Sequence, residues 1–214
     1  MHKKLPCPDQ ELICINVDKV YDWVMKENTF DYFLPATPLT FTGITGTTSL
    51  IGSVVSCEVT PATTNPFVIL RRENRSFMID GCKVCLQQLT IQKNFNLVLF
   101  VTLADGTVLR APSQTISRSE QVTLCAPEGT EIMVEYTDLD CIISSPGVPT
   151  LNTATQQITF TGLVISIATC QSIQSTYPVT VEFLADYCEP RADLALGACP
   201  PPTKPQQCHT VYPD

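Results

Sequence analysis

Hydrophobic and polar residues alternate along the middle of the chain. From Leu89 to Leu103 the odd positions are mostly hydrophobic, and the even positions between them are mostly polar. A period of two places one face of a strand in a core and the other face towards solvent. The run ends at Asp105-Gly106, a pair typical of hairpin turns, and Val108 begins a return strand. The pattern therefore predicts an antiparallel hairpin at the centre of the fold.

Further short strands are predicted on both sides of this hairpin. Each is bounded by residues that favour turns, and the ladder shows no helical period. This spacing is typical of an all-β fold, an antiparallel β-sandwich of jelly-roll or immunoglobulin-like type. The predicted strands are 54–59, 67–71, five strands of a ladder within 83–143, and then 158–168 and 179–186.

Composition divides the chain into three segments. Residues 1–53 are predicted to be an N-terminal arm and linker, because 35–53 are rich in Pro, Thr, Gly and Ser. Residues 54–188 are predicted to form the β-sandwich core, with a loop at 144–155 that contains two prolines and a glycine. Residues 189–214 form a tail rich in proline and cysteine, which is incompatible with regular structure.

The arm contains an amphipathic segment around the only tryptophan. Residues 13–17 alternate as in a strand, whereas the hydrophobic residues of 17–24 fall at helical spacing. Either structure leaves a hydrophobic face that another element must cover. Trp23 is interpreted first as a core residue, and the alternative is an interface anchor, a common role of tryptophan. Val20, Tyr21 and Trp23 are the predicted interface residues of the arm.

Composition and charge exclude several kinds of partner. The chain of 214 residues is 44% hydrophobic and 16% charged, which is typical of a protein with a substantial core. A formal net charge of −8 argues against binding to nucleic acid and to anionic membranes. No run of about 18 apolar residues is present to span a bilayer. The predicted partners therefore include neither nucleic acid nor membrane.

Eleven cysteines are the most unusual feature of the composition. Such a number is typical of chains that reach oxidising surroundings. Because the number is odd, one thiol of a subunit stays free or bonds to another molecule. The candidates for intersubunit disulfides, in arm and tail, are Cys7, Cys14, Cys199 and Cys208. The candidates for intrasubunit disulfides or core positions are Cys57, Cys82, Cys85, Cys125, Cys141, Cys170 and Cys188.

The sequence offers little for catalysis. The two histidines, His2 and His209, lie near the ends of the chain, where neither is easily held against a nucleophile. Asp138 and Asp140 lie two apart and could form a carboxylate pair, but they also suit a turn. No phosphate-binding or dinucleotide-binding glycine motif is present. We therefore predict that the protein is not an enzyme and has no catalytic residue and no cofactor.

Cys82 and Cys85 form a CxxC motif that enters a strand after Asp80-Gly81. A redox motif would open a helix, and a zinc site would need a second cysteine pair at similar spacing. Separate disulfides to distant strands, or one thiol facing outward, are the favoured alternatives. No metal site is predicted.

The N-terminal residues do not show the export signal that the cysteine content would suggest. Residues 1–8 carry charge without a following hydrophobic region, so they are not a secretory signal peptide. Three explanations are possible. The cysteines stay reduced or bind metal, the sequence is a processed form, or the protein leaves its cell by lysis, as spore coats and virions do.

Three stretches carry a resemblance to a known group of proteins. They are Cys14–Trp23 (CINVDKVYDW), Arg71–Asn74 (RREN) and Glu120–Gly129 (EQVTLCAPEG). They resemble spore-associated proteins of endospore-forming Firmicutes. The resemblance implies a structural protein of the spore coat or exosporium, made in the mother-cell cytoplasm without a signal peptide and oxidised after lysis. It implies no catalytic residue. The design is also similar to that of endospore appendages, in which β-sandwich subunits are joined by N-terminal arms and disulfides.

The leading hypothesis is therefore a self-assembling structural subunit of a spore-surface layer or fibre. Its partners would be other copies of itself and other spore-surface proteins, joined by arm or strand exchange and by disulfides. Three alternatives are left open: a β-sandwich binding module for carbohydrate or another surface ligand, a viral or phage particle protein, and a cytosolic zinc or redox protein.

Overall fold

The computed structural model describes residues 11–185, which form nine strands and no helix. The described segment therefore confirms the predicted all-β class. The predicted tail, both histidines, and Cys7, Cys188, Cys199 and Cys208 lie outside the described residues. The strands are β1 (Glu11–Phe33), β2 (Leu39–Thr40), β3 (Val54–Pro61), β4 (Phe67–Ile79), β5 (Cys82–Thr102), β6 (Val108–Arg110), β7 (Gln114–Leu124), β8 (Glu131–Asn152) and β9 (Gln157–Ala185).

The chain divides into two compact units. The larger unit is Asp18–Val179, and the smaller one contains Met1–Val17 and Thr180–Asp214. In the smaller unit the described residues are the outer ends of β1 and β9, where the Thr180 hydroxyl donates to the Asn16 side-chain oxygen at 2.7 Å. The predicted boundary at residue 53 falls within the larger unit, and the predicted boundary at residue 188 lies outside the described residues.

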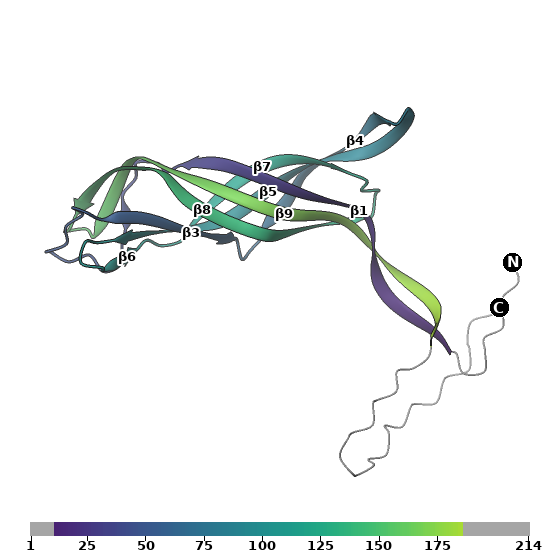
Figure 1. The fold of residues 1–214 in the computed structure, drawn as a ribbon, viewed down its shortest axis with the longest axis horizontal. Helices are drawn as coiled ribbons and strands as arrows, with labels where there is room; N and C mark the ends of the chain where they lie inside the picture. Colours follow the sequence, from purple (N-terminus) through teal and green to yellow (C-terminus); the bar gives the residue numbers. More distant parts are fainter. Residues whose placement is uncertain (1–10, 186–214) are drawn as a thin grey trace, which may run out of the picture. The chain divides into compact units, whose positions relative to one another are not determined.

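Two sheets make up the larger unit, and a single long strand lies at the centre of each (Figure 1). β9 pairs along one edge with β8, from Asn152↔Gln157 to Glu131↔Thr176, and along the other edge with β1 and β2. β5 has β3 and β4 along one edge and β7 and β6 along the other. The sheets pack face to face, which confirms the predicted antiparallel sandwich.

The alternation predicted around residue 95 is present, and it builds the core. The odd positions of β5 face inward from Leu89 to Val101, and most of them are fully buried. One hydrophobic cluster surrounds Phe95 and Phe160, and a second surrounds Leu89 and Ile173. Lys93 also takes an inward odd position, between the two clusters.

One disulfide joins the two sheets. Cys57 of β3 and Cys141 of β8 are bonded across 84 residues of sequence. β3 and β8 are outer strands of different sheets, so the bond closes one side of the sandwich. Both cysteines belong to the group predicted to lie inside the subunit.

The sandwich includes much of the predicted arm and linker. Residues 18–33 of β1 belong to a sheet of the larger unit, as strand and not as helix. Leu34, Phe41 and Ile44 are buried in the first hydrophobic cluster. The Pro, Thr, Gly and Ser content of 35–53 is typical of a loop, but a loop can still bury single large side chains while its backbone turns.

β8 and β9 are longer than predicted. The expected loop at 144–155 is strand as far as Asn152, despite Pro146 and Pro149. β8 is an edge strand, and an edge strand tolerates prolines because one side of its backbone has no partner strand. Register shifts after Tyr136 and Ile143 mark bulges, which bend a strand without ending it.

Candidate functional site

The hairpin of β4 and β5 continues beyond the second sheet as a two-stranded ribbon. Within residues 11–185, residues 75–86 pair only with each other, because β7 joins β5 from Gln87 onward. Asp80 and Gly81, both with positive φ (51° and 78°), form the two-residue turn. Phe77 and Met78 are exposed, with 70% of Met78 accessible. A lone two-stranded ribbon is marginally stable in water, so this one suits a partner.

The two cysteines of the CxxC motif lie on this ribbon, and both are exposed and unpaired among the described residues. Successive side chains of a strand point to opposite faces, so residues three apart cannot share a face. Cys85 lies on the face that continues the inward side of β5, and Cys82 lies on the other face. The two thiols therefore suit bonds to different partners and not one chelate.

β1 forms an outer edge of the first sheet and exposes a row of hydrophobic side chains. Tyr21, Trp23 and Met25 alternate along the same face, and 60% of Trp23 is accessible. The Trp23 indole N–H donates to the Ser172 hydroxyl at 2.7 Å, so the ring lies over β9. The interpretation of Trp23 as a core residue is wrong, because the core side of β1 is taken by Val24 and Phe30.

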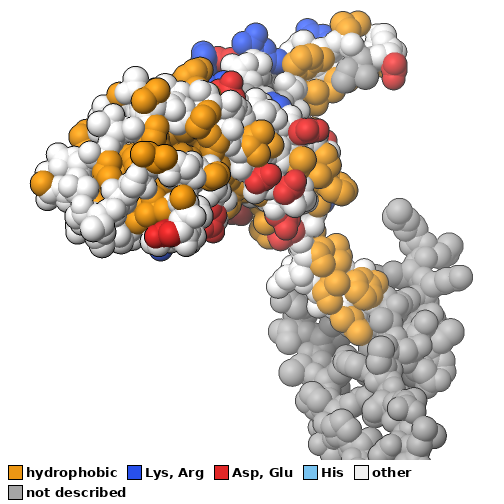
Figure 2. Space-filling model, turned by 60° about the vertical axis from the view of Figure 1, so that its left-hand side comes forward, with side chains coloured by type: hydrophobic (Ala, Val, Ile, Leu, Met, Phe, Trp, Pro, Cys, Tyr) orange, Lys and Arg blue, Asp and Glu red, His pale blue; other side chains and the backbone are white. Residues whose placement is uncertain are grey.

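A second exposed hydrophobic surface lies at the end of the sandwich near β3 and β6. Figure 2 shows hydrophobic side chains gathered over the face in view, with few charged side chains among them. Exposed hydrophobic residues of this end include Ile51, Val54, Val108 and Val148. A shallow hollow lies there between the loop of residues 48–51 and the end of β8 at residues 149–151.

The remaining described cysteines are distributed over the first sheet and the end of β7. Cys14 is exposed, on the part of β1 that belongs to the smaller unit. Cys125 and Cys170 are half-buried. Val20, the third predicted interface residue, is also exposed.

The predicted acid pair remains at the surface. Asp138 and Asp140 are exposed on β8, and Asp140 accepts a hydrogen bond from the backbone N–H of Cys141. Within residues 11–185 no group of three or more His, Cys, Asp or Glu side chains could hold a metal ion. The same residues contain no helix that is long and apolar enough to cross a membrane.

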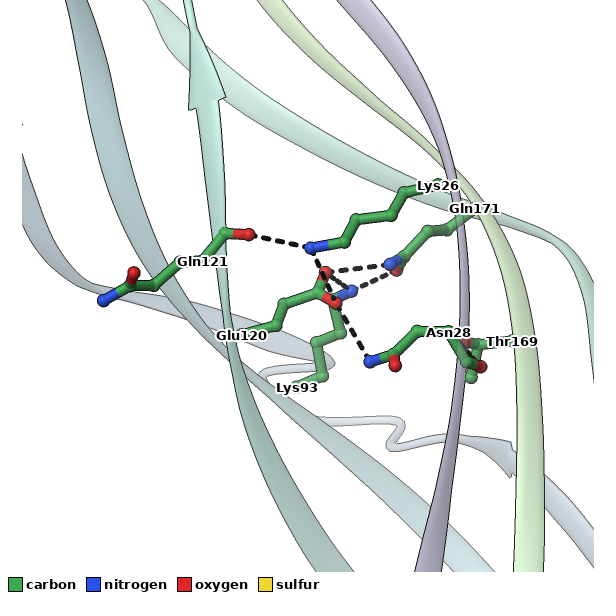
Figure 3. Close-up of polar contacts among 7 residues, drawn as sticks. All are labelled: Lys26, Asn28, Lys93, Glu120, Gln121, Thr169 and Gln171. Atoms are coloured by element: carbon green, nitrogen blue, oxygen red, sulfur yellow. Dashed lines mark hydrogen bonds and ion pairs between the residues drawn. The ribbon is translucent and has the colours of Figure 1, made fainter.

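A buried polar cluster lies between the two hydrophobic clusters of the core (Figure 3). Lys93 of β5, Glu120 of β7 and Gln171 of β9 meet there. Lys93 is 3% accessible and Gln171 is 0% accessible, so water has little access to either group. The cluster brings together polar side chains from both sheets.

Two residues of β1 complete the cluster. The Asn28 amide donates to Glu120 Oε2 at 3.3 Å, and Lys26 Nζ lies 3.6 Å from the same oxygen. Lys26 also donates to the backbone carbonyl of Gln121 at 2.7 Å, and Thr169 donates to the carbonyl of Asn28. The Glu120 carboxylate is therefore contacted by donors from three other strands.

Burial changes the acidity of the lysine in this cluster. Burial, and after it the positive charge of Lys26, lower the pKa of Lys93 to about 7. The Glu120 carboxylate acts in the opposite direction because it favours the ammonium form. Near neutral pH the proton is thus readily lost from Lys93, unlike that of a surface lysine.

Sequence reasoning missed this cluster. The signal was a lysine in the inward register of 89–103, where every other odd position is hydrophobic. Its partners could not be found in the sequence, since Glu120 is 27 residues away and Gln171 is 78 residues away.

Comparison with known proteins adds no relative. No family model matches the chain, and no curated protein and no solved structure matches it.

Proposed function

We propose that this protein is a self-assembling structural subunit of a spore-surface layer or fibre, whose copies are joined by strand contacts and intersubunit disulfides. The observation that carries the proposal is the position of the exposed thiols. Cys82 and Cys85 lie on the ribbon of residues 75–86, which has no third strand in the part of the chain that the structure describes, and Cys14 lies on the outer part of β1. Thiols in these positions are accessible to a second molecule.

Exposed hydrophobic groups on the same elements support the same function. Met78 and Phe77 are exposed on the ribbon, and Tyr21, Trp23 and Met25 are exposed on β1. β1 is also an edge strand, so its free backbone groups can pair with a strand of another copy. The occupant that we propose for these surfaces is a second copy of the chain, because a bond from the same thiols would hold it there.

The proposed location follows from the resemblance of Cys14–Trp23, Arg71–Asn74 and Glu120–Gly129 to spore-associated proteins. The subunit would be made in the mother cell with reduced thiols and would be oxidised after lysis. Its partners would be copies of itself and other spore-surface proteins. The proposed function includes no enzymatic activity.

The test is a comparison of the oxidised full chain on non-reducing and reducing gels. We expect a ladder of bands that collapses to the monomer when reductant is added. The variant Cys14→Ser/Cys82→Ser/Cys85→Ser should lose most of the ladder. The matched control Cys125→Ser/Cys170→Ser, which alters half-buried thiols, should keep it. A single monomer band of the oxidised wild-type chain would refute the proposal.

A further inference from the structure

The buried position of Lys93 calls for an explanation beyond packing. It lies on the inward face of β5 between Ile91 and Phe95, where a hydrophobic side chain would be the ordinary choice. Burying a charged group costs free energy even when it is paired, and hydrophobic replacements of buried ion pairs are often equally stable. Lys93 is therefore a candidate for a reactive amine and not only for a structural residue.

Gln171 presents its side-chain amide directly to that lysine. Lys93 Nζ contacts Gln171 Oε1, and the carbonyl carbon lies one bond beyond this oxygen. The Gln171 amide nitrogen donates to Glu120 Oε1 at 2.8 Å, and Lys93 Nζ contacts the same oxygen. One carboxylate oxygen thus touches both the amine and the amide nitrogen (Figure 3).

The surroundings favour reaction between the two groups. A neutral amine is the nucleophilic form of lysine, and burial makes Lys93 lose its proton near neutral pH. The rigid strands β5 and β9 hold the amine against the amide, which gives a large kinetic advantage over the same groups free in solution. Both side chains are almost inaccessible to water, so hydrolysis of the amide is disfavoured.

We propose that Lys93 and Gln171 form an intramolecular amide bond in the folded chain, with Glu120 as the catalytic proton carrier. The Lys93 Nζ–Gln171 Cδ bond forms and the Gln171 Cδ–Nε2 bond breaks. Glu120 takes a proton from the lysine nitrogen and returns it to the departing nitrogen, which leaves as ammonia. The step needs no oxidant, reductant or cofactor, because an amine and a primary amide give a secondary amide and ammonia.

Gln171 is the acceptor that the contacts select. Asn28 is the other carboxamide of the cluster, but its amide donates to Glu120 Oε2, whereas the hydrogen-bond partners of Lys93 among the described residues are Glu120 and Gln171. Lys26, the other amine, lies 3.6 Å from Glu120 Oε2 and donates to the backbone of Gln121. Lys26 and Asn28 are therefore positioning residues that orient the Glu120 carboxylate.

The bond would provide a second covalent connection between the sheets. Lys93 belongs to the sheet of β5 and Gln171 to the sheet of β9, which the Cys57–Cys141 disulfide also joins. The disulfide breaks under reducing conditions, whereas an amide does not. The sandwich would then keep one connection between its sheets before the cysteines are oxidised.

The deciding experiment is the intact mass of the purified full chain after reduction and denaturation. We expect a mass lower by about 17 Da than that of the unmodified chain, the mass of one ammonia. Fragmentation of a digest should show one branched peptide that contains both Lys93 and Gln171. An unchanged mass overturns the proposal, and so does a loss located at Asn28 or at any residue not joined to Lys93.

Substitutions of Lys93, Gln171 and Glu120 test the role of each residue in forming the bond. Lys93→Met, Gln171→Met and Glu120→Gln should each restore the full mass, the first two by removing a reactant and the third by removing the proton carrier. The matched control is Gln174→Met, because the Gln174 amide contacts Ser172 on the same strand and not the lysine. This control should keep the loss of about 17 Da. Loss of mass in the Glu120→Gln variant would overturn the role of Glu120.

Thermal unfolding distinguishes a covalent bond at Lys93 from an ion pair. The double variant Lys93→Met/Glu120→Gln removes both charges together, and joint replacement of the two partners of a buried ion pair is often neutral or stabilising. Removing a cross-link that spans 78 residues should instead lower Tm by on the order of 10 °C. An equal or higher Tm contradicts the proposal. Because these measurements use the monomer, their outcome is independent of self-assembly.

Discussion

Two side-chain hydroxyls in the described part of the chain, those of Tyr136 and Ser175, are buried without a hydrogen-bond partner. The Tyr136 ring lies edge-on to Phe95, with centroids 5.6 Å apart, so the ring itself is well packed. Burial raises the pKa of the Tyr136 hydroxyl above its usual range, because the charged form would lack solvent. The hydroxyl thus costs stability while the ring provides it.

Replacing Tyr136 with phenylalanine should therefore stabilise the protein. We expect Tyr136→Phe to raise the free energy of unfolding by about 1 kcal/mol at neutral pH, because an unsatisfied buried hydroxyl is removed. Urea denaturation of both chains measures this difference. A loss of about 1 kcal/mol or more would show that the hydroxyl has a partner.

The stability gained by Tyr136→Phe should depend on pH. The folded-state pKa of Tyr136 is raised, so above a pH of about 10 the unfolded chain releases this proton and the folded chain keeps it. Below that pH the titration of Tyr136 does not change the free energy of unfolding. Above it, the free energy of unfolding of the wild-type chain falls as the pH rises. The advantage of Tyr136→Phe should accordingly grow between pH 9 and about pH 11. An advantage that shrinks over this range would contradict the assignment.

At the scale of elements, β8 and β9 depend on a close contact between two glycines. Gly147 has a φ of 61°, and a Cβ there would lie 2.6 Å from the backbone of both Leu163 and Thr161. Gly162 of β9 has a φ of 78°, yet a Cβ there would meet nothing within 4 Å. Both positions have a positive φ, which glycine adopts readily and other residues do not, but they differ in the space available for a Cβ.

This difference predicts unequal effects of alanine at the two positions. Gly162→Ala should cost about 1 kcal/mol, for the positive φ alone. Gly147→Ala should cost about 3 kcal/mol or more, because the strands must also separate. Thermal or urea denaturation compares the two variants directly. Equal losses would show that the strands separate easily at this point.

The elements also show what the sequence could predict. Alternation around Leu97 predicted β5 correctly, because inward and outward positions follow a period of two wherever one face is buried. The bounds of β8 were missed at Pro146 and Gly147, since turn residues within an edge strand look the same in sequence as a loop. Trp23 was first assigned to the core because nothing local distinguishes the two faces of β1.

Pairing at long range lies beyond such reasoning. Lys93 stood out in its hydrophobic register, but its contact with Gln171 depends on how two sheets pack. Likewise, the predicted set of cysteines inside the subunit contained Cys57 and Cys141 without indicating that they bond to each other. Strand order and sheet packing, which no local pattern encodes, decide both contacts.

At the scale of the whole molecule, the Cys57–Cys141 disulfide should provide a large part of the stability. It closes a loop of 84 residues, and a loop of this length corresponds to about 4 kcal/mol when the unfolded chain is constrained. We expect reductant to lower the free energy of unfolding of the wild-type chain by about this amount. The variant Cys57→Ala/Cys141→Ala should be insensitive to reductant.

A matched pair of substitutions controls for the effect of altered cysteines in general. Cys125→Ala/Cys170→Ala changes two half-buried thiols that form no bond within residues 11–185. This variant should retain the sensitivity of the wild-type chain to reductant. A wild-type chain that unfolds equally with and without reductant would refute the contribution of the disulfide.

Self-assembly is the central claim, and electron microscopy of the oxidised full chain tests it most directly. The ribbon and β1 each carry exposed thiols and exposed hydrophobic side chains, which predict fibres or sheets at high protein concentration. Adding reductant should shorten or dissolve them, and the variant Cys14→Ser/Cys82→Ser/Cys85→Ser should form few. Grids that show only dispersed monomers of the oxidised wild-type chain would contradict the account.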